Sequence, residues 1–141
     1  MTHRIAAVLG QFHRTQTTLM LETVQEYAHA HNLEIIEPIW VPGAMEKPLA
    51  IKQLLMRPDI HGAVALGIIE RGETKNGLVL AQTVFPALMQ LQLDTLKPVG
   101  LGILGPEIFP SQIPSRLAPK AKGAIAAVHQ MLQLNLGMPS P

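Results

Sequence analysis

The run GAVALGI, residues 62–68, followed by IERGET, residues 69–74, decides the fold class of this chain. Consecutive small and apolar residues without a charge are typical of a strand covered on both faces, and such strands belong to parallel sheets. The charged turn that follows therefore lies at the carboxyl end of a buried strand. In open α/β sheets, ligands bind at that end because its loops are free to carry chemistry.

Strand and helix patterns alternate along the rest of the chain. Further strands are expected at residues 4–9, 33–41 and 98–104, and helices through 19–28 and over 44–56, 75–93 and 120–136. This alternation, with connections long enough for right-handed crossovers, specifies a parallel sheet with helices on both faces. The predicted fold is a three-layer α/β sandwich.

Local signals refine this prediction. Thr15 or Thr17 can cap the first helix. Pro38 lies inside the second strand, which places that strand at a sheet edge or a bulge. Gly105-Pro106 is expected to form a turn after the last strand.

Composition limits the class of protein. A chain of 141 residues can bury one core without disulfides, so we expect a single domain over residues 1–141. With 48% hydrophobic and 15% charged residues, the chain has an apolar excess that a homo-oligomer would cover. The net charge of +1 gives no long-range attraction to nucleic acid or to an anionic membrane.

The absence of cysteine excludes disulfides, zinc thiolates and thiol nucleophiles, and it fits a cytoplasmic protein. About six apolar residues follow Arg4, too few for a signal sequence or a membrane span. Five of the histidines, His3, His29, His31, His61 and His129, show no ligand spacing, so no metal site is expected.

Three loops at strand ends are expected to share one edge of the sheet: Gln11-Phe12-His13, residues 42–46 and residues 69–74. This edge would offer an aromatic face at Phe12 and a carboxylate at Glu46. Gly72-Glu73-Thr74 opens a helix, where free backbone amides and the helix dipole can hold a phosphate.

Each of these features also has a purely structural interpretation. Phe12 can cover the core, Arg71 and Glu73 can form a solvated ion pair, and Glu46 can favour the start of its helix. The cations Arg116, Lys120 and Lys122 can be the solvated start of the last helix.

Two segments together carry a family resemblance. Residues 41–48 read VPGAMEKP and residues 65–74 read ALGIIERGET, and Lys122-Gly123 follows near the end. With this spacing the chain resembles 6,7-dimethyl-8-ribityllumazine synthase, a transferase of riboflavin biosynthesis. The resemblance implies a flavodoxin-like sandwich with a four-stranded parallel sheet, assembly as pentamers or multiples of pentamers, and active sites between subunits.

The resemblance also implies a reaction and its site residues. 5-Amino-6-(D-ribitylamino)uracil would condense with 3,4-dihydroxy-2-butanone 4-phosphate, releasing phosphate and water, with no cofactor. Phe12 would stack on the pyrimidine. The ring and ribityl chain would be held by Ala44, Met45, Glu46, Ile68, Ile69 and Glu70. Phosphate would be bound by Gly72, Glu73 and Thr74, helped by Arg116 and Lys122, with Arg71 as a catalytic cation.

The sequence departs from the family pattern at the expected acid/base. The family places a histidine two residues after the RGxT motif, followed by an aromatic, and here Asn76 and Gly77 stand there. An amide cannot take up a proton near neutral pH, so the place of the histidine would be taken by water, by His13 or by nothing. Leu101 stands where a second aromatic is expected, which weakens stacking on a flat ring.

Two classes of function follow. The first is lumazine synthase activity, slowed by loss of the histidine. The second is a diverged paralogue that binds a flavin, a lumazine or another phosphorylated ligand, or that mainly assembles. An intermediate alternative is riboflavin synthesis by an archaeal-type relative of this fold.

Overall fold

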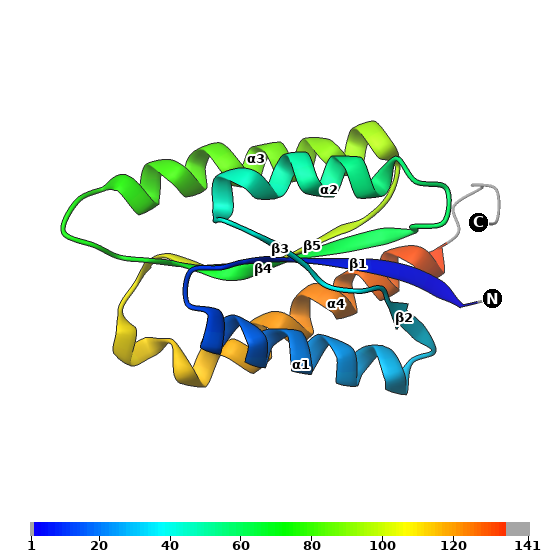
Figure 1. Cartoon of the computed structure of the whole chain (residues 1–141), viewed down its shortest axis with the longest axis horizontal. Coiled ribbons are helices and arrows are strands. Elements are labelled where there is room, and N and C mark those ends of the chain that lie inside the picture. The colour runs from blue at the N-terminus through cyan, green and yellow to red at the C-terminus, as the bar shows by residue number, and fades with distance from the viewer. Residues whose placement is uncertain (1, 135–141) are drawn as a thin grey trace.

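Figure 1 shows the computed structural model of the chain, which describes residues 2–134. The strands are β1 (His3–Gly10), β2 (Leu33–Ile35), β3 (Ile39–Val41), β4 (Gly62–Glu70) and β5 (Val99–Ile108). The helices are α1 (Arg14–Ala30), α2 (Lys47–Leu55), α3 (Asn76–Thr95) and α4 (Leu117–Leu134), with 3₁₀ turns η1 (Ala44–Glu46), η2 (Pro110–Gln112) and η3 (Pro114–Arg116). The predicted α/β class is confirmed.

All strand pairs are parallel, in the order β2-β1-β4-β5, and β3 also pairs with β1. Helices α2 and α3 cover one face of this sheet, and α1 and α4 cover the other (Figure 1). Because the strands are parallel, the carboxyl ends of β1, β3 and β4 lie at the same edge. That edge carries the loops singled out from the sequence.

The two central strands are buried on both faces, as their continuous apolar runs predict. Their side chains alternate between two cores. Ile5, Ala7 and Leu9 pack with residues of α1 and α4, whereas Ala6 and Val8 pack with residues of α2 and α3. Each fully buried large side chain contributes roughly 1.5–3 kcal/mol, so these strands form the rigid base of the loop edge.

The strand predicted at residues 33–41 is divided at Pro38 into β2 and β3. The sheet therefore has five strands instead of the predicted four. Proline has no amide to donate, so pairing with β1 stops there and resumes at Ile39. The expected edge position of this segment is confirmed.

The turn predicted at Gly105-Pro106 is wrong, because β5 continues through it to Ile108. The Gly105-Pro106 peptide is cis, and Gly105 has a φ of 96°. The strand pairing shifts register here, between Ile68 and Glu70 of β4. A side chain at position 105 would collide with the carbonyl oxygen of Ile69. Glycine is required at this irregularity, which brings Glu107 toward the loop edge.

The first helix starts without the predicted threonine cap. His13 precedes it in a left-handed conformation, with φ 58°, and makes no side-chain cap. Thr17 is buried, and its hydroxyl donates instead to the His13 carbonyl at 3.0 Å. The last helix begins at Leu117, earlier than predicted, and residues 135 and 136 of that prediction lie outside the described residues.

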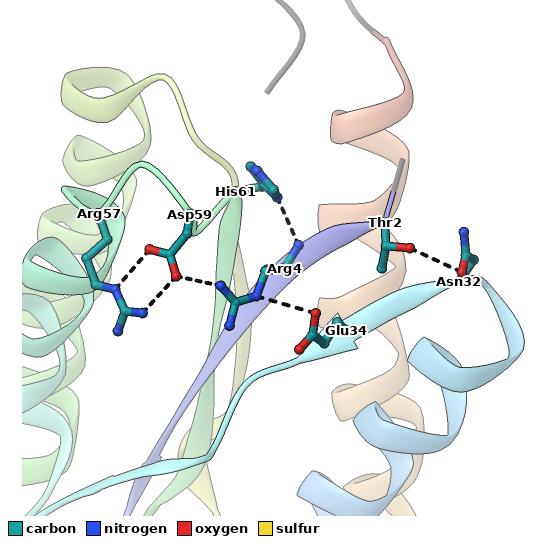
Figure 2. Close-up of polar contacts among 7 residues, drawn as sticks. All are labelled: Thr2, Arg4, Asn32, Glu34, Arg57, Asp59 and His61. Carbon is teal, nitrogen blue, oxygen red and sulfur yellow. Dashed lines mark hydrogen bonds and ion pairs between the residues drawn. The ribbon is translucent and has the colours of Figure 1, made fainter.

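A polar network joins the opposite, amino-terminal ends of the strands (Figure 2). Arg4 Nη1 donates to Asp59 Oδ2 at 2.6 Å, and its backbone amide donates to His61 Nδ1 at 2.9 Å. Arg57 also donates to Asp59, and these hydrogen bonds hold the pKa of that carboxyl below its usual value. The network fixes β1 against the start of β4, far along the strands from the loop edge.

Candidate active site

The loop after β1 is tied to the loop after β3. The Gln11 amide donates to the Val41 carbonyl at 2.9 Å. Phe12 is 71% exposed, so the interpretation that it covers the core is wrong. A Cβ at Gly43 would lie 3.3 Å from the Phe12 ring and 3.5 Å from Glu46 Oε1. The glycine thus lets an aromatic face and a carboxylate come together at the edge.

The residues between β3 and α2 form η1. Ala44 is half-buried, whereas Met45 and Glu46 are exposed. Glu46 is the residue before α2 but makes no side-chain cap to it. Its carboxylate is therefore available to a ligand while still lying near the positive end of the helix dipole.

His13, in the loop after β1, lies beside the end of β4, at the edge where the sequence placed it. Ile68 and Ile69 are buried, and Glu70 is half-buried. His13 Nε2 lies 3.3 Å from Glu70 Oε2. A histidine in contact with the Glu70 carboxylate therefore lies at this edge.

The turn of Gly72, Glu73 and Thr74 is exposed and precedes α3. A Cβ at Gly72 would meet nothing within 4 Å. Within residues 2–134, neither Glu73 nor Thr74 donates a backbone hydrogen bond to another backbone group. The Thr74 hydroxyl accepts from the Asn76 amide at 3.3 Å, which shapes the turn and leaves two amides open to solvent.

Glu107 is a charged residue of this region that sequence reasoning missed. Its carboxylate lies 3.4 Å from Arg71 Nε and 3.7 Å from Lys75 Nζ. The Arg71 guanidinium also lies 5.1 Å from the centre of the Phe109 ring. Arg71 therefore pairs with Glu107 and not with Glu73. The pairing of Arg71 with Glu107 was missed because the turn predicted at residues 105–106 placed Glu107 outside the strand.

Lys47 is the second residue that sequence reasoning missed. It is the first residue of α2, yet it is only 2% exposed. Burial lowers the pKa of its amine from 10.5 to about 8, and the nearby charge of Glu46 opposes this shift. Lys47, Ile51 and Leu55 are the buried residues of the helix. Their spacing of four was the signal in the sequence, because it places the lysine on the buried stripe.

Three predicted site residues make no hydrogen bond or ion pair with the loop edge within residues 2–134 of a single chain. Leu101 lies on β5, paired with Ala65, and is 37% exposed. Arg116 lies in η3 and donates to the Gln112 carbonyl at 2.9 Å, and Lys122 is exposed on α4. No hydrogen bond or ion pair of residues 2–134 joins them to Phe12, Glu46 or the 72–74 turn.

In the described part of the chain, no three His, Cys, Asp or Glu side chains lie close enough together to hold a metal ion. None of its helices has the length and apolar character needed to cross a membrane. A surface groove of about 260 Å³ lies elsewhere, between α1 and the start of α4, lined by Leu19, Glu22, Thr23, Glu26, Pro114, Leu117 and Ala118. The predicted site residues do not line that groove.

Comparison with known proteins decides the family. The model of a family described as 6,7-dimethyl-8-ribityllumazine synthase matches residues 2–136. The chain belongs to this family. The lumazine synthase of Staphylothermus marinus is 39% identical over 129 residues, covering 92% of this chain and 86% of that relative. That of Picrophilus torridus is 37% identical over 131 residues, covering 93% and 96%, and that of Methanopyrus kandleri is 35% identical over 130 residues, covering 92% of each.

The lumazine synthase match includes every strand of the sheet and each loop at its carboxyl edge. The resemblance predicted from the VPGAMEKP and RGET segments is therefore confirmed. In this member of the lumazine synthase family, the first residue of α3 is Asn76, which is exposed and carries a side-chain amide. Titratable side chains close to the edge include His13, Glu46, Glu70 and the buried Lys47.

Proposed function

We propose that this protein is a lumazine synthase, which condenses 5-amino-6-(D-ribitylamino)uracil with 3,4-dihydroxy-2-butanone 4-phosphate. The observation that carries the proposal is the placement of Phe12 over Gly43 beside Glu46, at the sheet edge that also carries the open 72–74 turn. An aromatic face, a carboxylate and unpaired amides match a flat polar ring and a phosphate. Membership in the family supports the same reaction.

Each loop has a proposed role in binding. Phe12 stacks on the pyrimidine, and residues 44–46 with residues 68–70 hold its polar edge and ribityl chain. The amides of Glu73 and Thr74 bind the phosphate of the second substrate, with Gly72 allowing its close approach. Arg71 supplies positive charge beside this turn.

The remaining residues are proposed to act from a neighbouring copy of the chain. Leu101, Arg116 and Lys122 are exposed, and within the described part of their own chain they make no hydrogen bond or ion pair with the loop edge. A pentamer, or a multiple of pentamers, would bring Leu101 to the ring and the two cations to the phosphate. It would also cover exposed apolar residues of α3, such as Val79, Met89 and Leu93. We place the protein in the cytoplasm, with no nucleic-acid or membrane partner.

A paralogue without synthase activity is the second candidate, and Asn76 and Leu101 favour it. The amide of Asn76 cannot exchange protons, and Leu101 provides no aromatic face. Such a protein would retain the 72–74 turn for a flavin, a lumazine or another phosphorylated ligand.

Glu107→Gln is expected to strengthen phosphate binding at the turn. The carboxylate now pairs with both Arg71 and Lys75, and its loss leaves the full charge of both cations next to the anion. Exposed pairs contribute about 0–1 kcal/mol, so affinity should rise by up to about five-fold. Calorimetric titration with inorganic phosphate measures this. Glu22→Gln on α1 is the matched control, and weaker binding in Glu107→Gln would contradict the assignment.

The proposed function is tested by incubating the purified protein with both substrates and following lumazine absorbance. Light scattering on the same sample checks that its mass is a multiple of five chains. Absorbance should rise only when both substrates are present. Binding of lumazine without its formation would identify the paralogue instead.

A further inference from the structure

The position of Lys47 is unfavourable for stability by itself. A buried cation is costly unless it is paired, and a cation at the start of a helix opposes the helix dipole. No carboxylate among residues 2–134 lies within ion-pair distance of the amine, although the charge of Glu46 acts on it from further away. An apolar residue would suit this buried stripe of α2 better, so packing alone does not account for lysine here.

Two glycines make room for the amine. A Cβ at Gly10 would lie 2.9 Å from Lys47 Nζ, and a Cβ at Gly67 would lie 3.0 Å from it. The amine therefore lies against the backbones of β1 and β4, where both central strands lack a side chain. Gly10 is the last residue of β1, two residues before Phe12.

The same contacts connect the amine to the candidate site. A Cβ at Gly10 would also lie 3.8 Å from the Cα of Gly43. Gly43 is the residue over which the Phe12 ring and the Glu46 carboxylate meet. Lys47 Nζ and Gly43 therefore both flank Gly10, which places the amine close to the part of the edge that is proposed to hold the pyrimidine.

The amine keeps a path to solvent. In the described residues, no side-chain nitrogen is both sealed from solvent and without a hydrogen bond. The lysine hydrogen bonds of these residues are made by Lys97. The amine of Lys47 has no hydrogen-bond partner among these residues, so it is not fully sealed from solvent.

We propose that Lys47 is the catalytic residue that exchanges protons with the substrates, in place of the histidine absent at Asn76. This inference rests on the proposed function. When the pyrimidine amine forms its bond to the ketone carbon, the Lys47 ammonium gives a proton to the ketone oxygen. The neutral lysine then takes a proton from the attacking nitrogen. Lys47, again an ammonium, gives a second proton to the hydroxyl, which leaves as water while the nitrogen lone pair forms the C=N bond. The neutral lysine then takes the remaining proton from the iminium nitrogen, so the product is a neutral imine and Lys47 ends as an ammonium.

Few other titratable groups face the amine. Glu46 approaches from η1, and Glu70 on β4 is in contact with His13. The other charged residue of α2 is the exposed Lys52, and Asp94, the charged residue of α3, is the penultimate residue of that helix. Because the pKa of Lys47 is lowered to about 8, both of its protonation states are populated in mildly alkaline solution. His13 is the rival proton-exchanging group.

The test measures kcat and kcat/KM from pH 6 to 10 for the wild-type assembly and for three variants. Lys47→Met removes the amine and keeps an unbranched side chain, Lys52→Met removes the same charge from the exposed face of α2, and His13→Gln removes the rival. The wild type should show an inflection near pH 8. Lys47→Met should lose that inflection and about 10² to 10⁴ in turnover, while Lys52→Met keeps both.

Several results would overturn the proposal. Lys47→Met could turn over within about three-fold of the wild type with the same pH profile, or the inflection could disappear in His13→Gln instead. Circular dichroism and light scattering establish that each variant is folded and assembled. An inactive wild type would count against the proposed function and against this role together. Calorimetric binding of the pyrimidine substrate in two buffers then shows whether proton exchange on binding depends on Lys47, which separates a failed reaction from a wrongly placed amine.

Discussion

Lys47→Met is expected to stabilise the folded protein at pH 7 by about 1 to 3 kcal/mol, although it lowers activity. The pKa of the amine falls from 10.5 to about 8 on folding. Such a difference corresponds to about 3 kcal/mol at full effect. Methionine fills a similar volume on the buried stripe of α2 without a charge to desolvate.

The free energy of unfolding should depend on pH, because the pKa of Lys47 is lower in the folded chain than in the unfolded one. Below pH 8 the amine is protonated in both states, so the full destabilisation is present. Between pH 8 and 10.5 the unfolded chain binds more protons than the folded one, and stability rises with pH. Above that range both states are neutral and the destabilisation is gone. The difference in stability between wild type and Lys47→Met should therefore shrink as pH rises.

Urea denaturation of both proteins at pH 7 and pH 10 measures this difference. The comparison is made at one protomer concentration, because assembly couples to unfolding. Lys52→Met on the exposed face of the same helix should change stability little at either pH. A Lys47→Met protein that is less stable than the wild type at pH 7 would show that the amine is stabilised by contacts in the assembly.

Asn76→His is expected to raise the turnover of Lys47→Met by at most about 10² to 10⁴, and to raise that of the wild type far less. Position 76 begins α3 beside the 72–74 turn, where the family resemblance places a histidine. In Lys47→Met, a histidine there would supply a proton acceptor in place of the amine that the variant has lost. The wild type already exchanges protons through Lys47, so it has less to gain.

Turnover of the wild type, both single variants and the double variant forms a cycle that measures this coupling. Asn76→Gln is the matched control, since its amide cannot accept a proton. An equal gain in both backgrounds would mean that the two groups act independently. No gain in either would indicate that Gly77 and Leu101 hold the ring too poorly for a base to help.

Local patterns predicted the central part of the fold. Strands β1 and β4 are buried on both faces, and such strands are coded by continuous apolar runs. The errors arose where backbone geometry depends on a neighbouring strand. Pro38 has no amide to donate, and it lies between β2 and β3, which both pair with β1. Gly105-Pro106 lies within β5, where the carbonyl oxygen of Ile69 leaves no room for a side chain at position 105.

In the candidate site too, features set by local patterns could be predicted, and features set by contacts between distant segments could not. The carboxyl ends of parallel strands meet at one edge, so the loops with Phe12, Glu46 and Gly72 could be placed from the sequence. Family resemblance supplied their roles. The burial of Lys47 and the pairing of Glu107 with Arg71 depend on contacts between distant segments. Only the spacing of Lys47, Ile51 and Leu55 hinted at the first.

The central claim is that this edge of the sheet performs the lumazine synthase condensation without a histidine at position 76. Its most direct test counts lumazine formed and phosphate released in one sample of wild-type protein with both substrates at pH 8. Equal amounts of the two products are expected, at a rate proportional to protein concentration. Phosphate release without lumazine, or neither product from a folded and assembled protein, would contradict it.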